Sequence, residues 1–128
     1  MAKRNILCFD TSLQGVSCGL IQPDTQTSYK IVKPGYRGQA QQIVPIIQRL
    51  LHLGGVEFKD LDMIYCTKGP GAFTGLRVGL ALAKSLKLAL SASFFGVNTL
   101  DVLACQAVEI CSKENLSYDN IMVVIETK

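Results

Sequence analysis

The sequence has few of the residues from which metal and redox sites are built. It contains one histidine, His52, so a histidine-based metal site within this chain is excluded. The five cysteines form no Cys-x-x-Cys pair, and their odd number without metal-ligand spacing indicates reduced, mostly buried thiols, as is typical of a cytoplasmic protein. We therefore expect no metal and no disulfide framework.

Charge and uninterrupted apolar runs are also scarce. Charged residues make up 18% of the chain and the net charge is +3, an excess too small to indicate nucleic-acid binding by itself. The most apolar stretch, 78–90, contains Lys84 and Lys87, which makes it a poor membrane span. Asp10 interrupts the first apolar run, so the start of the chain does not resemble a secretory signal. With 48% apolar residues in 128, we expect one domain with a buried core, in the cytoplasm and away from membranes.

The remaining pattern predicts a mixed α/β fold. Three early runs of strand formers, joined by short turn signals, predict an antiparallel meander. Later segments alternate between helical periodicity and short apolar runs. The expected strands are residues 5–9, 16–21, 27–33, 61–67, 94–97 and 121–125, and the expected helices are 39–53, 72–90 and 100–111. This order is that of the ribonuclease-H-like half of the actin-like ATPase fold, a mixed sheet flanked by helices.

Two short segments affect the predicted course and start of the helices. Pro45 removes a backbone donor inside the first helix, so we expect a kink there, or a helix whose regular part begins near Pro45. Asn98 and Thr99 have the character of an N-cap for the third helix.

Two turns are candidates for phosphate contact. Gly69-Pro70-Gly71 predicts a turn before a helix, whose unpaired N–H groups can bind an anion, but the spacing matches neither the P-loop nor the dinucleotide fingerprint. Asp10-Thr11-Ser12 ends the first strand, where a carboxylate can hold Mg²⁺ through water and hydroxyls can meet phosphate oxygens. Both segments are equally compatible with ordinary turns.

The helix after Gly71 carries small residues on one side. Gly75, Gly79 and Ala83 are four residues apart and share a helical face, which lets another backbone approach closely. The stripe is compatible with packing on the chain's own first helix or with a subunit interface. The residues that we expect at such an interface are Ile43, Ile47, Phe73, Gly75, Leu76, Gly79, Leu80 and Ala83.

No arrangement of side chains indicates catalysis. Ser12, Ser17 and Ser85 lack a plausible base. A carboxylate site could in principle be assembled from Asp10, Asp60 and Asp62, but nothing in their spacing requires one. We therefore expect no catalytic residues and no cofactor.

Two strings in the chain resemble the TsaB (YeaZ) family. They are ILCFDTS at 6–12 and GPGAFTGLRVG at 69–79, and segments 40–47 and 95–100 match in order, so the resemblance covers nearly the whole chain. It implies a bacterial, cytoplasmic protein of the actin-like ATPase fold that takes part in making threonylcarbamoyladenosine beside the anticodon of tRNA.

The resemblance also implies partners. In that system a TsaD-like subunit is catalytic, the TsaB-like paralogue dimerises with it without catalysing, and a TsaE-like ATPase joins them, so that tRNA is met only indirectly. The family's interface uses the first and second helices as a helix bundle. A homodimer through the helix at 72–90 is the other arrangement that we consider.

The chain departs from the family pattern in two respects. Gln39 stands where TsaB-like chains often have a histidine and where the TsaD pattern begins its His-x-x-x-His metal site, and Gln41 replaces a frequent glutamate; neutral amides cannot replace such ligands. Family members also continue into a second, smaller domain. We therefore expect residues 1–128 to be a single N-terminal actin-like subdomain, with the second domain absent or truncated after Lys128.

Two functional hypotheses follow. The first is a non-catalytic dimerisation subunit for tRNA N6-threonylcarbamoyladenosine biosynthesis, in which the phosphate-facing residues are vestigial. The alternative is a nucleotide-binding hydrolase or small-molecule kinase of the same fold that uses those residues. They are Asp10, Thr11, Ser12, Gly69 and Gly71.

Overall fold

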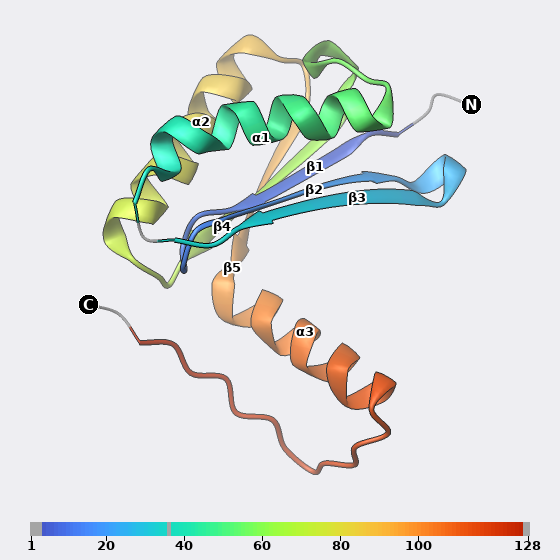
Figure 1. Ribbon diagram of the computed structural model, residues 1–128, viewed down its shortest axis with the longest axis vertical. Coiled ribbons are helices and arrows are strands. Elements are labelled where there is room, and N and C mark those ends of the chain that lie inside the picture. Colours follow the sequence, from blue (N-terminus) through green and yellow to red (C-terminus); the bar gives the residue numbers. More distant parts are fainter. Residues whose placement is uncertain (1–3, 36, 127–128) are drawn as a thin grey trace.

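The computed structural model describes residues 4–35 and 37–126. Five strands form one sheet in the order β3-β2-β1-β4-β5, with helices α1 and α2 on one face and α3 on the other (Figure 1). The strands are β1 Ile6–Asp10, β2 Val16–Gln22, β3 Thr27–Lys33, β4 Met63–Gly69 and β5 Ser93–Asn98. The helices are α1 Gln39–Gly54, α2 Phe73–Ala89 and α3 Thr99–Lys113, with short 3-10 turns η1 Pro23–Thr25 and η2 Phe58–Asp60.

The predicted meander is confirmed. Strands β1, β2 and β3 pair antiparallel through short connections, whereas β1 pairs with β4, and β4 with β5, in parallel. Parallel neighbours need a crossover, and α1 and α2 supply these crossovers. The mixed sheet therefore has β1 at its centre.

The core lies between the sheet and the α1–α2 layer. Alternate residues of β1 point into it, Leu7 at 0% and Phe9 at 3% exposure, and α1 presents an apolar stripe from the other side. Ile43 and Ile47 belong to this stripe, with 2% and 0% exposure. Both side chains pack inside the chain, and their contact with a partner subunit stays a prediction.

Helix α1 is a single helix with Pro45 inside it. It begins at Gln39, so the expectation of a regular part beginning near Pro45 is wrong. Gly38 at the N-cap and Gly55 at the C-cap are both left-handed, and Gly55 N–H donates to the carbonyls of His52 and Leu51, which ends the helix.

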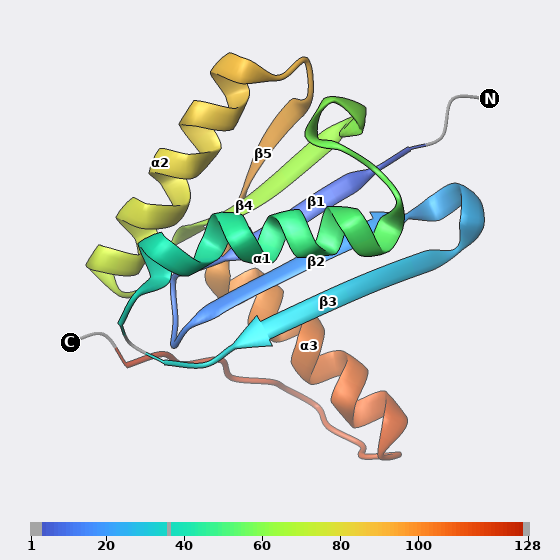
Figure 2. The same ribbon diagram turned by 45° about the horizontal axis from the view of Figure 1, so that its top comes forward.

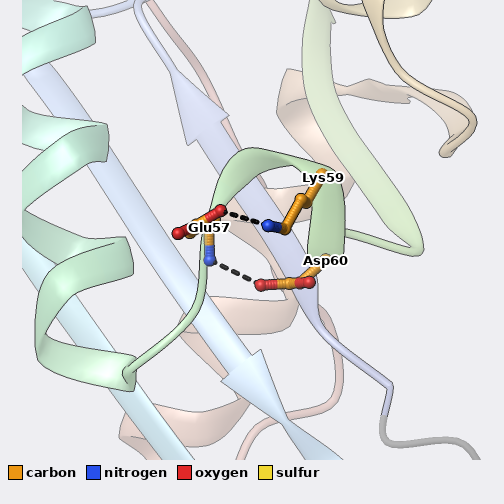
Figure 3. Close-up of polar contacts among 3 residues, drawn as sticks. All are labelled: Glu57, Lys59 and Asp60. Carbon is orange, nitrogen blue, oxygen red and sulfur yellow. Dashed lines mark hydrogen bonds and ion pairs between the residues drawn. The ribbon is translucent and has the colours of Figure 1, made fainter.

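The connection from α1 to β4 is held by its own charged residues. Glu57 and Asp60 form a capping box around η2, in which Glu57 N–H donates to Asp60 Oδ2 at 2.8 Å (Figure 3). Lys59 Nζ pairs with Glu57 Oε2 at 2.8 Å on the exposed side. Asn5, at the start of the chain's central strand, is tied to the same turn, because its side-chain amide donates to the Asp60 carbonyl at 2.9 Å.

The strand predicted at 121–125 does not form. Residues 116–126 leave α3 as an extended segment without strand pairing (Figure 1), and Met122 and Val124 are 88% and 78% exposed. An apolar run becomes a strand only where a sheet edge receives its hydrogen bonds, and this segment does not lie along one. In the part of the chain that the structure describes, no helix is both long enough and apolar enough to cross a membrane.

Candidate functional site

Asp10 is the centre of a hydrogen-bonded cluster at the carboxyl end of β1. Its Oδ1 accepts from Ser12 N at 3.0 Å, from the Ser12 hydroxyl, and from Thr67 Oγ1 at 2.5 Å. Thr67 comes from β4, the parallel neighbour of β1, and Thr99 Oγ1 lies 3.4 Å from Ser12 Oγ. The Asp10 carboxylate thus joins the β1–β2 turn to β4, and the Ser12–Thr99 contact joins the same turn to the start of α3.

A groove opens beside this cluster on the α3 side of the sheet. It has a volume of about 490 Å³, and its lining includes Cys8, Asp10, Tyr65, Val97 and Val102. Its walls are mostly apolar, with Asp10 and Thr67 among the few polar groups. Asp10 therefore lines a concave surface of the protein.

Other residues of the predicted phosphate-facing set are committed to contacts within the chain. The Thr11 hydroxyl is buried and donates to the Gly75 carbonyl at 2.6 Å, and Ala72 N–H at the start of α2 donates to the Ser12 carbonyl at 2.7 Å. A Cβ on Gly71 would lie 2.4 Å from the same Ser12 oxygen. The β1–β2 turn therefore occupies the place beside the α2 N-terminus where an anion was expected.

Gly69 has the left-handed φ of +116° that favours glycine, and it turns the chain from β4 toward α2. Its role in the structure is to direct the helix. Contact between Gly69 and a phosphate stays a prediction.

Gln39 belongs to this site, although the sequence did not predict its contact with the β1–β2 turn. Its side chain is 8% exposed, and its Nε2 donates to the carbonyls of Gly15 at 2.7 Å and Thr11 at 3.2 Å. The signal was present in the sequence, because Gln39 continues the buried face of α1 on which Ile43 lies. A polar residue on an apolar helix face indicates a buried hydrogen-bonding role.

The cysteines near Asp10 are not nucleophiles. Burial, reinforced by the charge of Asp10, raises the pKa of Cys18 and of Cys66 to about 12, and burial raises the pKa of Cys8. These thiols are protonated at neutral pH and so are unreactive. Among residues 4–35 and 37–126, no group of three or more His, Cys, Asp or Glu side chains is placed to hold a metal ion.

The small-residue stripe of α2 faces the sheet. A Cβ on Gly75 would lie 1.9 Å from the Thr11 carbonyl oxygen, one on Gly79 would lie 2.6 Å from Thr11 Oγ1, and Ala83 is 9% exposed. The backbone that approaches closely is therefore that of Thr11, in the turn after β1 of the same chain, and the Gln39 side chain of α1 lies against Gly75 as well. These three residues are buried within the chain, and their part in a subunit interface stays a prediction.

The exposed side of α2 carries a different set of residues, which we call the outer row. Phe73 is 71% and Leu88 is 91% exposed, and the Arg77 guanidinium carbon lies 5.4 Å from the centroid of the Phe73 ring. Leu76 and Leu80 are half-buried. The outer row consists of Phe73, Arg77, Ala81, Lys84 and Leu88, all of them exposed.

The outer row adjoins the exposed side of α1. The two helices lie beside each other on the same face of the sheet (Figure 2). Val44 and Leu53 on α1 are 37% and 50% exposed. The α1–α2 layer therefore presents a continuous helical surface with separated apolar side chains.

Comparison with known proteins agrees with this geometry. Residues 28–122 match the family described as "TsaD: tRNA N6-adenosine threonylcarbamoyltransferase". The chain belongs to the TsaB (YeaZ) family. It is 33% identical over 102 residues to the tRNA threonylcarbamoyladenosine biosynthesis protein TsaB of Buchnera aphidicola subsp. Schizaphis graminum, covering 80% of this chain and 48% of that protein.

Two further relatives extend the family comparison. The TsaB protein of Escherichia coli K12 is 32% identical over 99 residues, which is 77% of this chain and 42% of that protein. The structure of YeaZ from Pseudomonas aeruginosa superposes with a TM-score of 0.78 at 30% identity, over 83% of this chain and 49% of that one. The expected actin-like ATPase fold is thereby confirmed, and the chain spans about half the length of the relatives it matches.

Proposed function

We propose that this chain is a non-catalytic subunit for the biosynthesis of N6-threonylcarbamoyladenosine in tRNA. In this proposal it acts in the cytoplasm and pairs with a TsaD-like catalytic subunit, a TsaE-like ATPase joins the pair, and tRNA is met only through the complex. Its membership of the TsaB family and the names of its TsaB relatives support this role. Because the chain covers about half of each relative, the activity of the whole protein belongs to the proposal.

The observation that carries the non-catalytic assignment is the position of Gln39. The related catalytic pattern begins a metal site at this position of the first helix, whereas here the Gln39 amide is buried and donates to Thr11 and Gly15 carbonyls. The N–H groups of this amide hydrogen-bond to the β1–β2 turn and hold it in place. A neutral amide cannot act as an imidazole-type metal ligand. In this proposal the catalytic step is therefore carried out by the partner subunit.

The surface best suited to that partner is the outer side of the α1–α2 layer. Phe73 and Leu88 are exposed on the outer row, and Val44 is exposed on α1. Aromatic and arginine side chains at the centre of a contact contribute most of its binding energy, and the Phe73–Arg77 pair supplies both. The expected interface residues Phe73, Leu76 and Leu80 remain part of this proposal.

The proposal is tested by co-purification. A tagged TsaD-like protein from the same organism is mixed with the 128-residue chain, and complex formation is measured by native mass spectrometry and titration calorimetry. Phe73→Asp should weaken binding by at least tenfold, because it places an unpaired charge in an apolar contact. Val108→Asp on α3, 46% exposed and away from the α1–α2 layer, is the matched control and should bind as the original chain does.

Two outcomes would count against the proposal. One is the absence of any complex when a full-length TsaB relative binds its own TsaD-like subunit under the same conditions. The other is calorimetric binding of ATP with Mg²⁺ that disappears in Asp10→Ala, which would support the hydrolase or kinase alternative instead.

A further inference from the structure

The segment after α3 contains a strand-forming run whose backbone is unpaired. Residues 121–125 have the sequence IMVVI, without a charge and rich in residues that favour strands. Met122 and Val124 are exposed, while the residues on either side of each of them are less so, which is the twofold period of an extended strand. Within residues 4–35 and 37–126, the backbone of this run makes no hydrogen bond. The run therefore has the form of a strand without a neighbour.

The sheet has one protected edge and one open edge. Strands β3 and β5 lie at the two ends of the strand order. Strand β3 carries Lys30 and Lys33, both exposed, and lysine on an edge strand discourages pairing with another chain. Strand β5 has the sequence SFFGVN and carries no charge. The edge that is free to accept a further strand is therefore β5.

The open side of β5 presents both backbone groups and an aromatic side chain. Ser93 N–H donates toward β4, to the Asp62 carbonyl at 2.8 Å, so the alternation of a strand directs the backbone groups of Phe94 and Gly96 away from β4. Phe95 stacks on Tyr65 with ring centroids 4.9 Å apart and is still 43% exposed. An aromatic ring on an edge strand packs well against a β-branched residue of the next strand.

From this complementarity we propose that residues 121–125 of one copy of this chain add to β5 of a second copy as a further strand, and that the second copy does the same in return. Each copy supplies one unpaired strand and one open edge, so a twofold pair leaves neither of them unmatched. The exchange goes beyond the proposed function and uses neither α1 nor α2.

The position of the segment favours a second copy over the chain's own β5. Helix α3 begins where β5 ends, and the segment runs back past α3 to a place away from β5 in both views (Figures 1 and 2). As it lies, the segment is not beside the open edge of its own sheet. A second copy can bring that edge to it, and strand exchange of this kind is a common route to a dimer.

The association is measured by sedimentation velocity of the 128-residue chain over about a hundredfold range of concentration. We expect a monomer that converts to a dimer as concentration rises. Hydrogen exchange on the same samples should show the amides of residues 121–125 and of Phe94 and Gly96 becoming protected together, at least tenfold, as the dimer forms.

Charges on the segment test its part in the dimer. Met122→Lys with Val124→Lys places lysines at exposed positions and should weaken the dimer at least tenfold, because charge on a strand opposes its addition to an edge. The matched control is Leu116→Lys with Tyr118→Lys, which adds the same charge at exposed positions outside the run and should change the dimer less than twofold. Circular dichroism confirms that each variant folds.

A charge on β5 tests the other half of the contact. Ser93→Lys gives β5 the protection that β3 already has, and should weaken the dimer at least tenfold. The Ser93 variant retains its segment and the Met122/Val124 variant retains its edge. A mixture of the two should therefore associate more strongly than either variant alone, through one strand and one edge.

Several results would overturn the exchange. They are a monomer at every concentration, protection of residues 121–125 that does not depend on concentration, which would assign the strand to the chain's own β5, and a dimer that the Met122/Val124 variant leaves unchanged. Open-ended assemblies without a dimer would contradict its reciprocity. Because α1 and α2 take no part, each of these results leaves the proposed function intact, and failure of the TsaD-like pairing leaves the exchange intact.

Discussion

Asp10 and Gln39 hold the same turn from two sides. Asp10 receives the Ser12 N–H and hydroxyl, while the Gln39 amide reaches the Thr11 and Gly15 carbonyls. Both side chains work by satisfying groups that would otherwise be buried without partners. Asp10 was recognised from the sequence because it ends a strand, but its partner Thr67 is distant in the chain and is brought near only by the parallel pairing of β1 and β4.

At the scale of single residues, the buried thiols make stability depend on pH. The pKa of Cys18 and Cys66 is raised to about 12 from the ordinary 9.0, by burial first and by Asp10 second. Above about pH 9 the unfolded chain loses these protons while the folded chain keeps them, so the contribution of the two thiols to the free energy of unfolding is constant below pH 9 and falls toward pH 12. We expect a loss of about 2–3 kcal/mol by pH 10 from the two thiols together, measured by urea denaturation.

The matched control is Cys18→Ala with Cys66→Ala. This variant should be less stable at neutral pH because it leaves small cavities, but its stability should fall less steeply between about pH 9 and pH 11. If the free energy of unfolding fell equally steeply with pH in the variant and in the original chain, groups other than these thiols would be responsible for the loss of stability.

At the scale of elements, residue patterns predicted the helices and strands well, but they did not predict which neighbour each face meets. The spacing of Gly75, Gly79 and Ala83 correctly placed these residues on one face of α2. The neighbour of that face is the Thr11 backbone, which only the folded β1–β2 turn brings there. The apolar run 121–125 has strand character, but pairing depends on a sheet edge beside it, and local propensity does not contain that information.

The contact between α2 and the β1–β2 turn yields a direct test. Gly75→Ala should destabilise the chain by about 2–3 kcal/mol, because the new methyl group would lie 1.9 Å from the Thr11 carbonyl oxygen and the helix must move. Ala81→Leu, on the exposed side of the same helix, should change the free energy of unfolding by less than about 0.5 kcal/mol. Thermal and urea unfolding of both variants measure the difference.

The stability of Gly75→Ala also determines which variants can be used to study partner binding. If Gly75→Ala were as stable as the original chain, the stripe would not be packed against the Thr11 backbone, and that result would favour its assignment to an interface. Since Gly79 lies against Thr11 and Cys66, a bulky residue there damages the fold itself. Variants of the outer row are the appropriate probes of a partner.

At the scale of the whole molecule, the residues that form the five-stranded sheet and its three helices all precede the segment after residue 120. Residues 121–126 form no strand, and Met122 and Val124 are exposed. A chain ending at Asn120 should therefore have a free energy of unfolding within about 1 kcal/mol of that of the 128-residue chain. A larger loss of stability in urea denaturation would mean that this segment is part of the core.

The order of the strands has a consequence for how the chain folds in time. Leu7 pairs with Leu20 on one side, a neighbour that emerges soon after it, and with Ile64 on the other, a neighbour that emerges only after α1 has been made. The early meander is a local structure, whereas the pairing of β1 with β4 closes a long loop and is intrinsically slow. During synthesis the second edge of β1 is therefore open until β4 arrives, and the strand at the centre of the finished sheet is the first to be made and among the last to be enclosed.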